Sequence, residues 1–181
     1  MNKMNKHQAG AVLVVGLFVL LILSIIGVFA TQSSELQEKM AGNVRNRNLA
    51  FQAAESALVA GETYLAKTSA PVFNCTNGLY KPRDINCDGA LETVEVWDDS
   101  SVWGTEGKSV KFDTDGVASN IDLVGLVASP RYIIEEIDTV CATNVTPCPV
   151  ADQKKTYRVT ARAVGTSTDA VVMLQSVFSP T

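Results

Sequence analysis

The strongest constraint on this chain is a run of 20 residues, Ala11 to Ala30, without a single charged side chain. A helix rises about 1.5 Å per residue, so this run spans roughly 30 Å, the thickness of the hydrocarbon core of a bilayer. The sequence therefore predicts one membrane-spanning helix near the N-terminus. The rest of the 181-residue chain has the length of one further domain.

A short polar segment, Met1–Gly10, precedes the apolar run. Its two lysines, Lys3 and Lys6, favour a cytoplasmic position, so that the chain after Ala30 would be periplasmic. Three interpretations are open: a secretory signal cut near Ala30, an uncleaved anchor, or a leader cut before the run. A polar leader that ends in Gly10, directly before the apolar run, favours the third.

The helical pattern continues beyond the membrane run. Residues 35–65 contain no proline, and their apolar positions recur at helical spacings: Leu36, Met40, Val44, Phe51, Ala54, Leu58 and Leu65. We expect one helix from about Ala11 to Ala66, with Gly42 and Gly61 as its weak points. Its outer half is expected to lay this apolar stripe on the following domain, and its inner half to face lipid or neighbouring helices.

Three sequence motifs in this helix carry a family resemblance. They are Gly10-Ala11-Val12-Leu13, Met40-Ala41-Gly42-Asn43 and Ala50-Phe51-Gln52-Ala53-Ala54-Glu55-Ser56-Ala57-Leu58. Over roughly residues 8–62 they resemble the PilX family of type IV pilus minor pilins. The leader is similar to the prepilin signal of type IV pilins and type II secretion pseudopilins.

The resemblance implies how the N-terminus matures. A membrane peptidase would cut after Gly10, and Ala11 would become the methylated N-terminus. Most pilins carry a glutamate at the fifth mature position, where this chain has Val15. A charge at that depth is costly in lipid and is usually matched by the N-terminal amine of a neighbouring subunit. Its absence indicates a subunit near the tip, which has no neighbour above it, as in PilX-type minor pilins and K-type tip pseudopilins.

The segment after the helix reads as an acidic, disulfide-bonded head. Residues 68–181 hold 9 basic and 15 acidic side chains, a balance that disfavours direct binding to nucleic acid. The four cysteines, which all follow the apolar run, predict two disulfides in an exported domain: Cys75, Cys87, Cys141 and Cys148. Of the three pairings we favour Cys75–Cys87 with Cys141–Cys148, because each closes a short polar loop. Reduced cysteines are the alternative.

Six short segments of the head are rich in β-branched or alternating residues. Strands are expected at Glu92–Trp97, Val110–Phe112, Ile121–Val127, Arg131–Ile137, Tyr157–Val164 and Val171–Phe178. The last two would form a hairpin. The expected fold class is α+β, a pilin-like fold with the helix packed on a small antiparallel sheet. The expected divisions are a leader (1–10), a transmembrane part (11–30), an amphipathic periplasmic part of the helix (31–67) and the head (68–181).

One loop of the head has the spacing of an EF-hand calcium loop. Its ligands would be side-chain oxygens of Asp84, Asn86 and Asp88, the carbonyl of Ala90 and the carboxylate of Glu95, with Glu92 acting through water. Pro82 lies just upstream and a strand is expected downstream, whereas an EF-hand has helices on both sides. A solvated polar turn is therefore the alternative to a calcium site.

The sequence gives no support for catalysis. The single histidine, His7, lies in the leader, and no phosphate loop or nucleophile motif is present. We expect a minor pilin that helps to initiate or cap pilus assembly, supporting twitching motility, adhesion or DNA uptake. The alternatives are a K-type pseudopilin of type II secretion and a membrane-anchored calcium-dependent adhesion module.

The resemblance also implies partners and a location. The partners would be other minor pilins, the major pilin, the prepilin peptidase and a tip adhesin. The chain would sit in the inner membrane with a periplasmic head before it enters the pilus at the cell surface. No cofactor is required by this interpretation, and calcium is the one candidate ligand.

Overall fold

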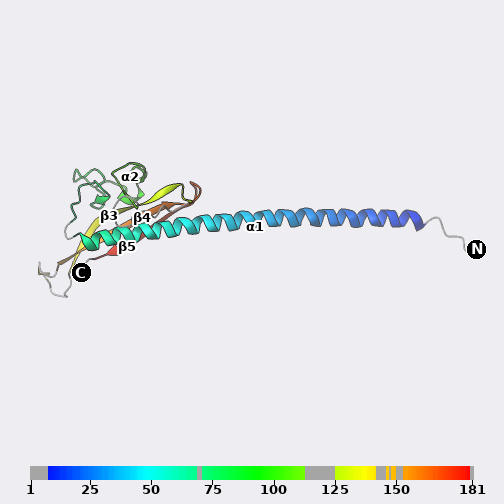
Figure 1. Ribbon diagram of the computed structural model, residues 1–181, viewed down its shortest axis with the longest axis horizontal. Helices are drawn as coiled ribbons and strands as arrows, with labels where there is room; N and C mark the ends of the chain where they lie inside the picture. The colour runs from blue at the N-terminus through cyan, green and yellow to red at the C-terminus, as the bar shows by residue number, and fades with distance from the viewer. Residues whose placement is uncertain are drawn as a thin grey trace, which may run out of the picture. The chain divides into compact units, whose positions relative to one another are not determined.

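The computed structural model describes residues 8–68, 71–112, 125–141, 146, 148–149 and 153–179. The chain divides into two compact units, Met1–Val44 and Arg45–Thr181. One long helix, α1 (Gln8–Lys67), contributes residues to both units (Figure 1). The predicted N-terminal helix is thus confirmed.

The second unit contains a mixed sheet. Its strands are β1 (Leu79–Tyr80), β2 (Val110–Lys111), β3 (Ala128–Cys141), β4 (Gln153–Val164) and β5 (Val171–Phe178). The strand order is β1-β3-β4-β5, and β2 pairs with β3. All pairs are antiparallel except the short β1, which runs parallel to β3. The predicted α+β class is confirmed, and the sheet is mixed rather than purely antiparallel.

The predicted strands differ in their outcomes. The structure has β2 and β5 at the expected places, and it extends the segments expected at Arg131–Ile137 and Tyr157–Val164 into the longer β3 and β4. The hairpin of β4 and β5 is also confirmed. Of the strand expected at Ile121–Val127, residues 121–124 lie outside the described part, and residues 125–127 form a turn and bend before β3.

The strand expected at Glu92–Trp97 is wrong. This segment is irregular and leads into a short 3-10 helix, η1 (Val96–Asp98), and then into α2 (Ser100–Gly104). The carboxylate of Asp99 accepts a hydrogen bond from the backbone N–H of Ser101 at 2.7 Å and so caps α2. The alternating residues mislead because Val96 is buried by packing on a sheet face rather than by pairing along a sheet edge.

The face of α1 that packs in the second unit is made mainly of small side chains. Its buried residues are Ala50, Ala53, Ala54, Ala57, Ala60, Gly61 and Leu65. The predicted apolar stripe is therefore wrong in part. Ala54 and Leu65 are buried, but Phe51 is 47% exposed, and Leu36, Met40 and Val44 are exposed as well. Small side chains prevail because the backbone of the helix lies very close to the sheet.

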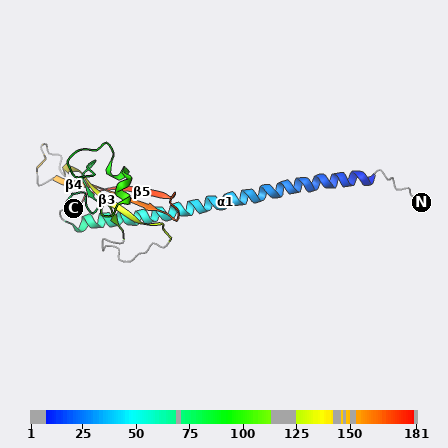
Figure 2. The same ribbon diagram turned by 90° about the horizontal axis from the view of Figure 1, so that it is seen from above.

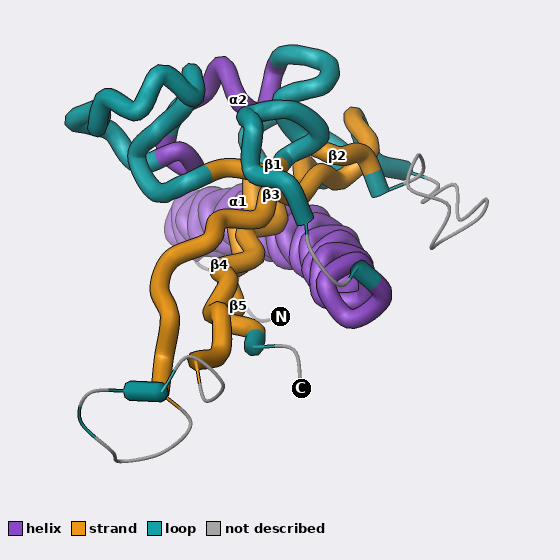
Figure 3. The backbone as a smooth tube through the Cα atoms, turned by 90° about the vertical axis from the view of Figure 1, so that its left-hand side faces the viewer, coloured by secondary structure: helices purple, strands orange, loops and turns teal. Residues whose placement is uncertain are grey.

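The sheet of the second unit is covered on both faces (Figures 2 and 3). On one face, Tyr132 and Ile134 of β3 and Val159 of β4 pack in one core with Ala57 and Ala60 of α1. On the opposite face, Ile133 packs with residues of the segment after β1: Ile85, Val96, Val102 and Trp103. This second layer is largely irregular, and it carries the acidic loop described below.

Candidate functional site

The first unit presents a continuous apolar surface. Every large apolar side chain from Val12 to Phe29 is 47–72% exposed. At Gly16 and Gly27 no atom lies within 4 Å of the position of an added Cβ, which leaves room for the backbone of another helix. By length and composition, the helix from Ala11 onward can cross a membrane. An apolar surface of this extent is unfavourable in water and suits lipid or other helices.

The residues expected at the leader junction lie at the start of this unit. Gly10 and Ala11 are both helical, close to the first residue of α1. Val15, at the expected fifth mature position, is 60% exposed and belongs to the apolar surface.

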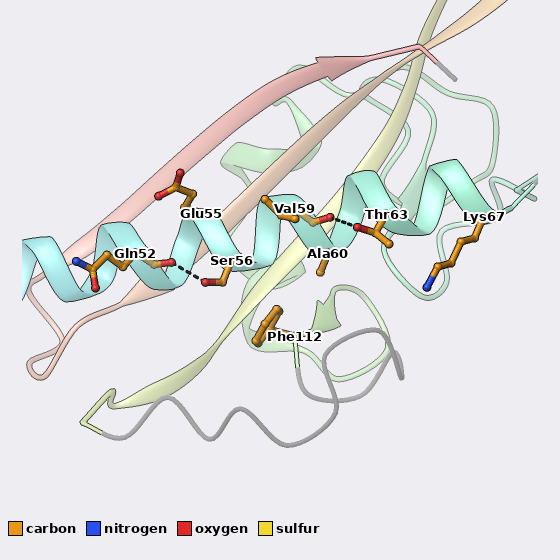
Figure 4. Close-up of a pocket in the computed structure, with 8 residues that line it drawn as sticks. All are labelled: Gln52, Glu55, Ser56, Val59, Ala60, Thr63, Lys67 and Phe112. Carbon is orange, nitrogen blue, oxygen red and sulfur yellow. Dashed lines mark hydrogen bonds between the residues drawn. The ribbon is translucent and has the colours of Figure 1, made fainter. Parts of the chain in front are cut away.

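In the second unit, a groove lies along one flank of α1, between this helix and Phe112 (Figure 4). It has a volume of about 660 Å³ and is lined by Gln52, Glu55, Ser56, Val59, Ala60, Thr63, Lys67 and Phe112. Two hydroxyls in it are already satisfied by the helix. Ser56 donates to the carbonyl of Gln52 at 2.9 Å, and Thr63 donates to that of Val59 at 2.7 Å. This lining offers a surface for contact rather than a reactive group.

A three-residue ion network joins the sheet to the irregular layer. Arg158 of β4 donates two hydrogen bonds to the fully buried carboxylate of Glu135 on β3, at 2.8 and 2.9 Å. It donates a third, at 3.0 Å, to the carboxylate of Glu95. Burial raises the pKa of Glu135, and the hydrogen bonds and charge of Arg158 oppose that shift. The network fixes the segment around Glu95 to the sheet.

The acidic loop brings together only part of the expected calcium ligands. The carboxylates of Asp84, Asp88 and Glu92 lie within 4.8 Å of one another. Glu95 is not among them, because Arg158 binds its carboxylate. Glu92 instead folds back and accepts hydrogen bonds from the backbone N–H of Ile85 at 3.0 Å and from the side chain of Asn86 at 3.1 Å.

The other expected ligands form hydrogen bonds with groups of the same loop. The backbone N–H of Ala90 donates to Oδ1 of Asp88 at 2.8 Å. The Nδ2 group of Asn86 binds Glu92, so this amide helps to position a carboxylate. The spacing of the sequence therefore identified the loop and two of the three clustered carboxylates. The spacing predicts Glu95 as the third direct carboxylate ligand and Glu92 as a ligand through water, whereas Glu92 is the third carboxylate of the cluster.

The four cysteines form two disulfides in the structure, Cys75–Cys87 and Cys141–Cys148. The first encloses the beginning of the acidic loop, and Sγ of Cys75 lies 3.2 Å from the carbonyl oxygen of Asp84. The second joins the end of β3 to a residue just before β4.

Comparisons with known protein families cover nearly the whole chain. A family model described as PilX N-terminal matches residues 9–59. A second, described as the C-terminal part of type IV pilus assembly protein PilX, matches residues 52–180. No curated protein and no solved structure matches the chain.

Proposed function

The chain belongs to the PilX family of type IV pilus assembly proteins, and we propose that it is a minor pilin that helps to initiate or cap pilus assembly near the tip. The observation that supports this role most directly is the exposed apolar surface from Val12 to Phe29. Such a surface has two uses. It anchors the subunit in the inner membrane before assembly, and it then packs against the helices of other pilins without water.

A position near the tip is supported by Val15. In a shaft, each subunit has neighbours above and below, and a buried glutamate near its N-terminus can be matched by the amine of a neighbour. Val15 and the residues around it up to Ala30 offer no charge for this purpose. A subunit that lacks this glutamate cannot pair with the N-terminal amine of a neighbour above it. It therefore fits best at the tip of the filament, where there is no such neighbour.

The proposed maturation is a cut after Gly10, which leaves Ala11 as the methylated N-terminus of the apolar helix. We expect mass spectrometry of the protein purified from its native membrane to show a mature chain that begins at Ala11. A chain that retains residues 1–10 would contradict a pilin role. In Gly10→Val the precursor should accumulate, whereas Gly16→Val, the same change within the apolar surface, should leave cleavage intact.

The proposed location is the inner membrane, with the head in the periplasm, followed by incorporation into the pilus. The proposed partners are the prepilin peptidase, other minor pilins, the major pilin and a tip adhesin. The role is structural rather than enzymatic, since the family consists of pilus assembly proteins. A calcium ion in the head is a separate proposal that the pilin role does not require.

A deletion strain tests the role in assembly. We expect loss of surface pili and of twitching motility, both restored by the intact gene. Intact pili with lost protein secretion would instead identify a K-type pseudopilin, and intact pili and secretion with reduced adhesion would identify an adhesion module.

Gold labelling of a tagged head tests the position of the subunit in the pilus. We expect label at pilus ends, and label along the shaft would contradict a tip role.

A further inference from the structure

We propose that the loop from Asp84 to Glu92 binds a calcium ion through the carboxylates of Asp84, Asp88 and Glu92. This ligand set differs from the one that the EF-hand spacing predicts, because it replaces Glu95 by Glu92. The inference does not depend on the proposed role in pilus assembly.

The buried state of Asp84 is the first observation that points to a cation. Its side chain is only 6% exposed, and its Oδ1 atom has no hydrogen-bond partner in the described part of the chain. A carboxylate removed from water without a partner is strongly unfavourable, and buried carboxylates are normally paired or bound to metal. The loop thus holds an acceptor oxygen that protein groups leave unused.

The second observation is the convergence of two further carboxylates on the same place. Oxygens of Asp84, Asp88 and Glu92 lie within 4.8 Å of one another. Calcium binds oxygen at about 2.3–2.6 Å, so two ligands on opposite sides of one ion are about 5 Å apart. None of these three carboxylates forms an ion pair with a lysine or arginine among the described residues. One divalent cation would offset their mutual repulsion.

The chemistry of the ligands selects the class of metal. Carboxylate oxygens are hard ligands, which suit calcium and magnesium. Magnesium demands near-ideal octahedral ligands at about 2.0–2.1 Å and gives up its water reluctantly, whereas an irregular loop suits the more tolerant calcium. Cys75 and Cys87 also lie near Asp84, but their sulfurs are joined to each other and provide no thiolate for zinc or copper.

The surrounding structure fixes the carboxylates before any ion binds. Glu92 is held by the backbone N–H of Ile85 and the side chain of Asn86, and each of its oxygens keeps a lone pair for a metal. The disulfide between Cys75 and Cys87 restrains the chain on the other side of the site. Less conformational entropy is therefore lost on binding than in a free acidic loop.

Calorimetry on the full chain in detergent, stripped of metal with a chelator, provides the test. We expect calcium chloride to give a saturable heat, with weaker binding of magnesium. Unfolding of the head, followed by tryptophan fluorescence, should become less favourable. At a calcium concentration about a hundredfold above the dissociation constant, the equilibrium constant for unfolding should fall about a hundredfold. No saturable heat with calcium would overturn the proposal.

Two glutamate substitutions, three residues apart, separate the two ligand sets. Glu92→Gln should abolish the calcium heat, whereas Glu95→Gln should retain it, because Glu95 binds Arg158 instead. The reverse result would overturn the proposed site in favour of the EF-hand set. Asp84→Asn removes a buried charge with little change in shape, so it should remain folded in chelator and lose the calcium heat. Asp98→Asn, at an exposed carboxylate outside the loop, should bind calcium normally.

Discussion

Replacement of Arg158 by methionine is expected to destabilise the head by about 3–5 kcal/mol at neutral pH, the usual effect of removing one partner of a buried ion pair. The side chain of Glu135 is 0% exposed, and Arg158 makes both of the hydrogen bonds that its two oxygens accept from the described residues. Methionine keeps most of the apolar stem of the arginine side chain, so the destabilisation comes mainly from the missing charge. Glu95 is 38% exposed and can be solvated, which makes its share small. Denaturant unfolding, followed by tryptophan fluorescence, measures the change, because Trp97 and Trp103 both lie in the head.

The loss should also depend on pH. Without Arg158, burial and the nearby negative charge of Glu95 raise the pKa of Glu135 further above its value in the unfolded chain. A carboxyl group with a higher pKa in the folded state binds more protons when folded, so its variant gains stability as the pH falls. We therefore expect the difference from the wild type to be smaller at about pH 5 than at about pH 7.

Two further variants control for lost packing. Arg158→Met combined with Glu135→Gln should recover much of the stability at neutral pH, since no charge is then left buried. Arg162→Met makes the same change on the same strand, at an arginine for which the described residues provide no ion pair. It should cost little. If both arginine variants unfold alike at neutral pH, the ion pair does not stabilise the head.

The elements predicted best are those whose sequence pattern is set by one uniform environment. The apolar run of α1 contains no charged residue, and an apolar environment would impose the same demand on every side of the helix. In β4, the residues Tyr157, Val159, Ala161 and Ala163 alternate with polar ones because the strand buries one face under α1. The other face is also covered around Arg158, which the alternation alone does not reveal.

The predicted apolar stripe is wrong in part because it rests on hydrophobicity. The volume of each side chain determines which residues of α1 pack on the sheet. Large apolar side chains such as Phe51 stay outside, while alanines lie against the sheet. The signal was present in the sequence as small residues at spacings of three and four, from Ala50 to Gly61. A close-packed interface accepts side chains by volume, and a helix backbone in close contact with a sheet leaves little room for long side chains at the points of contact.

The candidate cation site could be predicted only in part, because Arg158, which is distant in the sequence, binds one of the predicted ligands, Glu95. The local spacing from Asp84 to Glu95 predicts a single loop, but Arg158 lies 63 residues beyond Glu95. A charge-assisted hydrogen bond to that arginine pulls Glu95 towards the sheet and leaves Glu92 nearest the other carboxylates. Spacing rules describe the loop correctly until a tertiary contact competes for one of its ligands.

Gly61 appeared in the sequence as a weak point of the helix, but the structure gives it a different role. A Cβ atom at this position would lie 2.6 Å from Cγ1 of Val159 and 3.0 Å from Cδ2 of Tyr132. Both neighbours are buried, at 0% and 1% exposure, and Val159 is β-branched and cannot easily turn away. The absent side chain is what allows α1 to contact the sheet here.

Gly61→Leu is therefore expected to lower the free energy of unfolding of the head by about 2–3 kcal/mol, near the upper end for overpacking, even though leucine favours helix by up to about 1 kcal/mol. Gly42→Leu is the matched control, because it makes the same change in the same helix at a position with no atom within 4 Å of an added Cβ. It should be neutral or slightly stabilising. Denaturant unfolding of both variants, followed by tryptophan fluorescence, decides between the two roles of glycine. Equal stability of the variants would mean that Gly61 only weakens the helix, whereas a loss confined to Gly61→Leu would show that close contact between helix and sheet requires it.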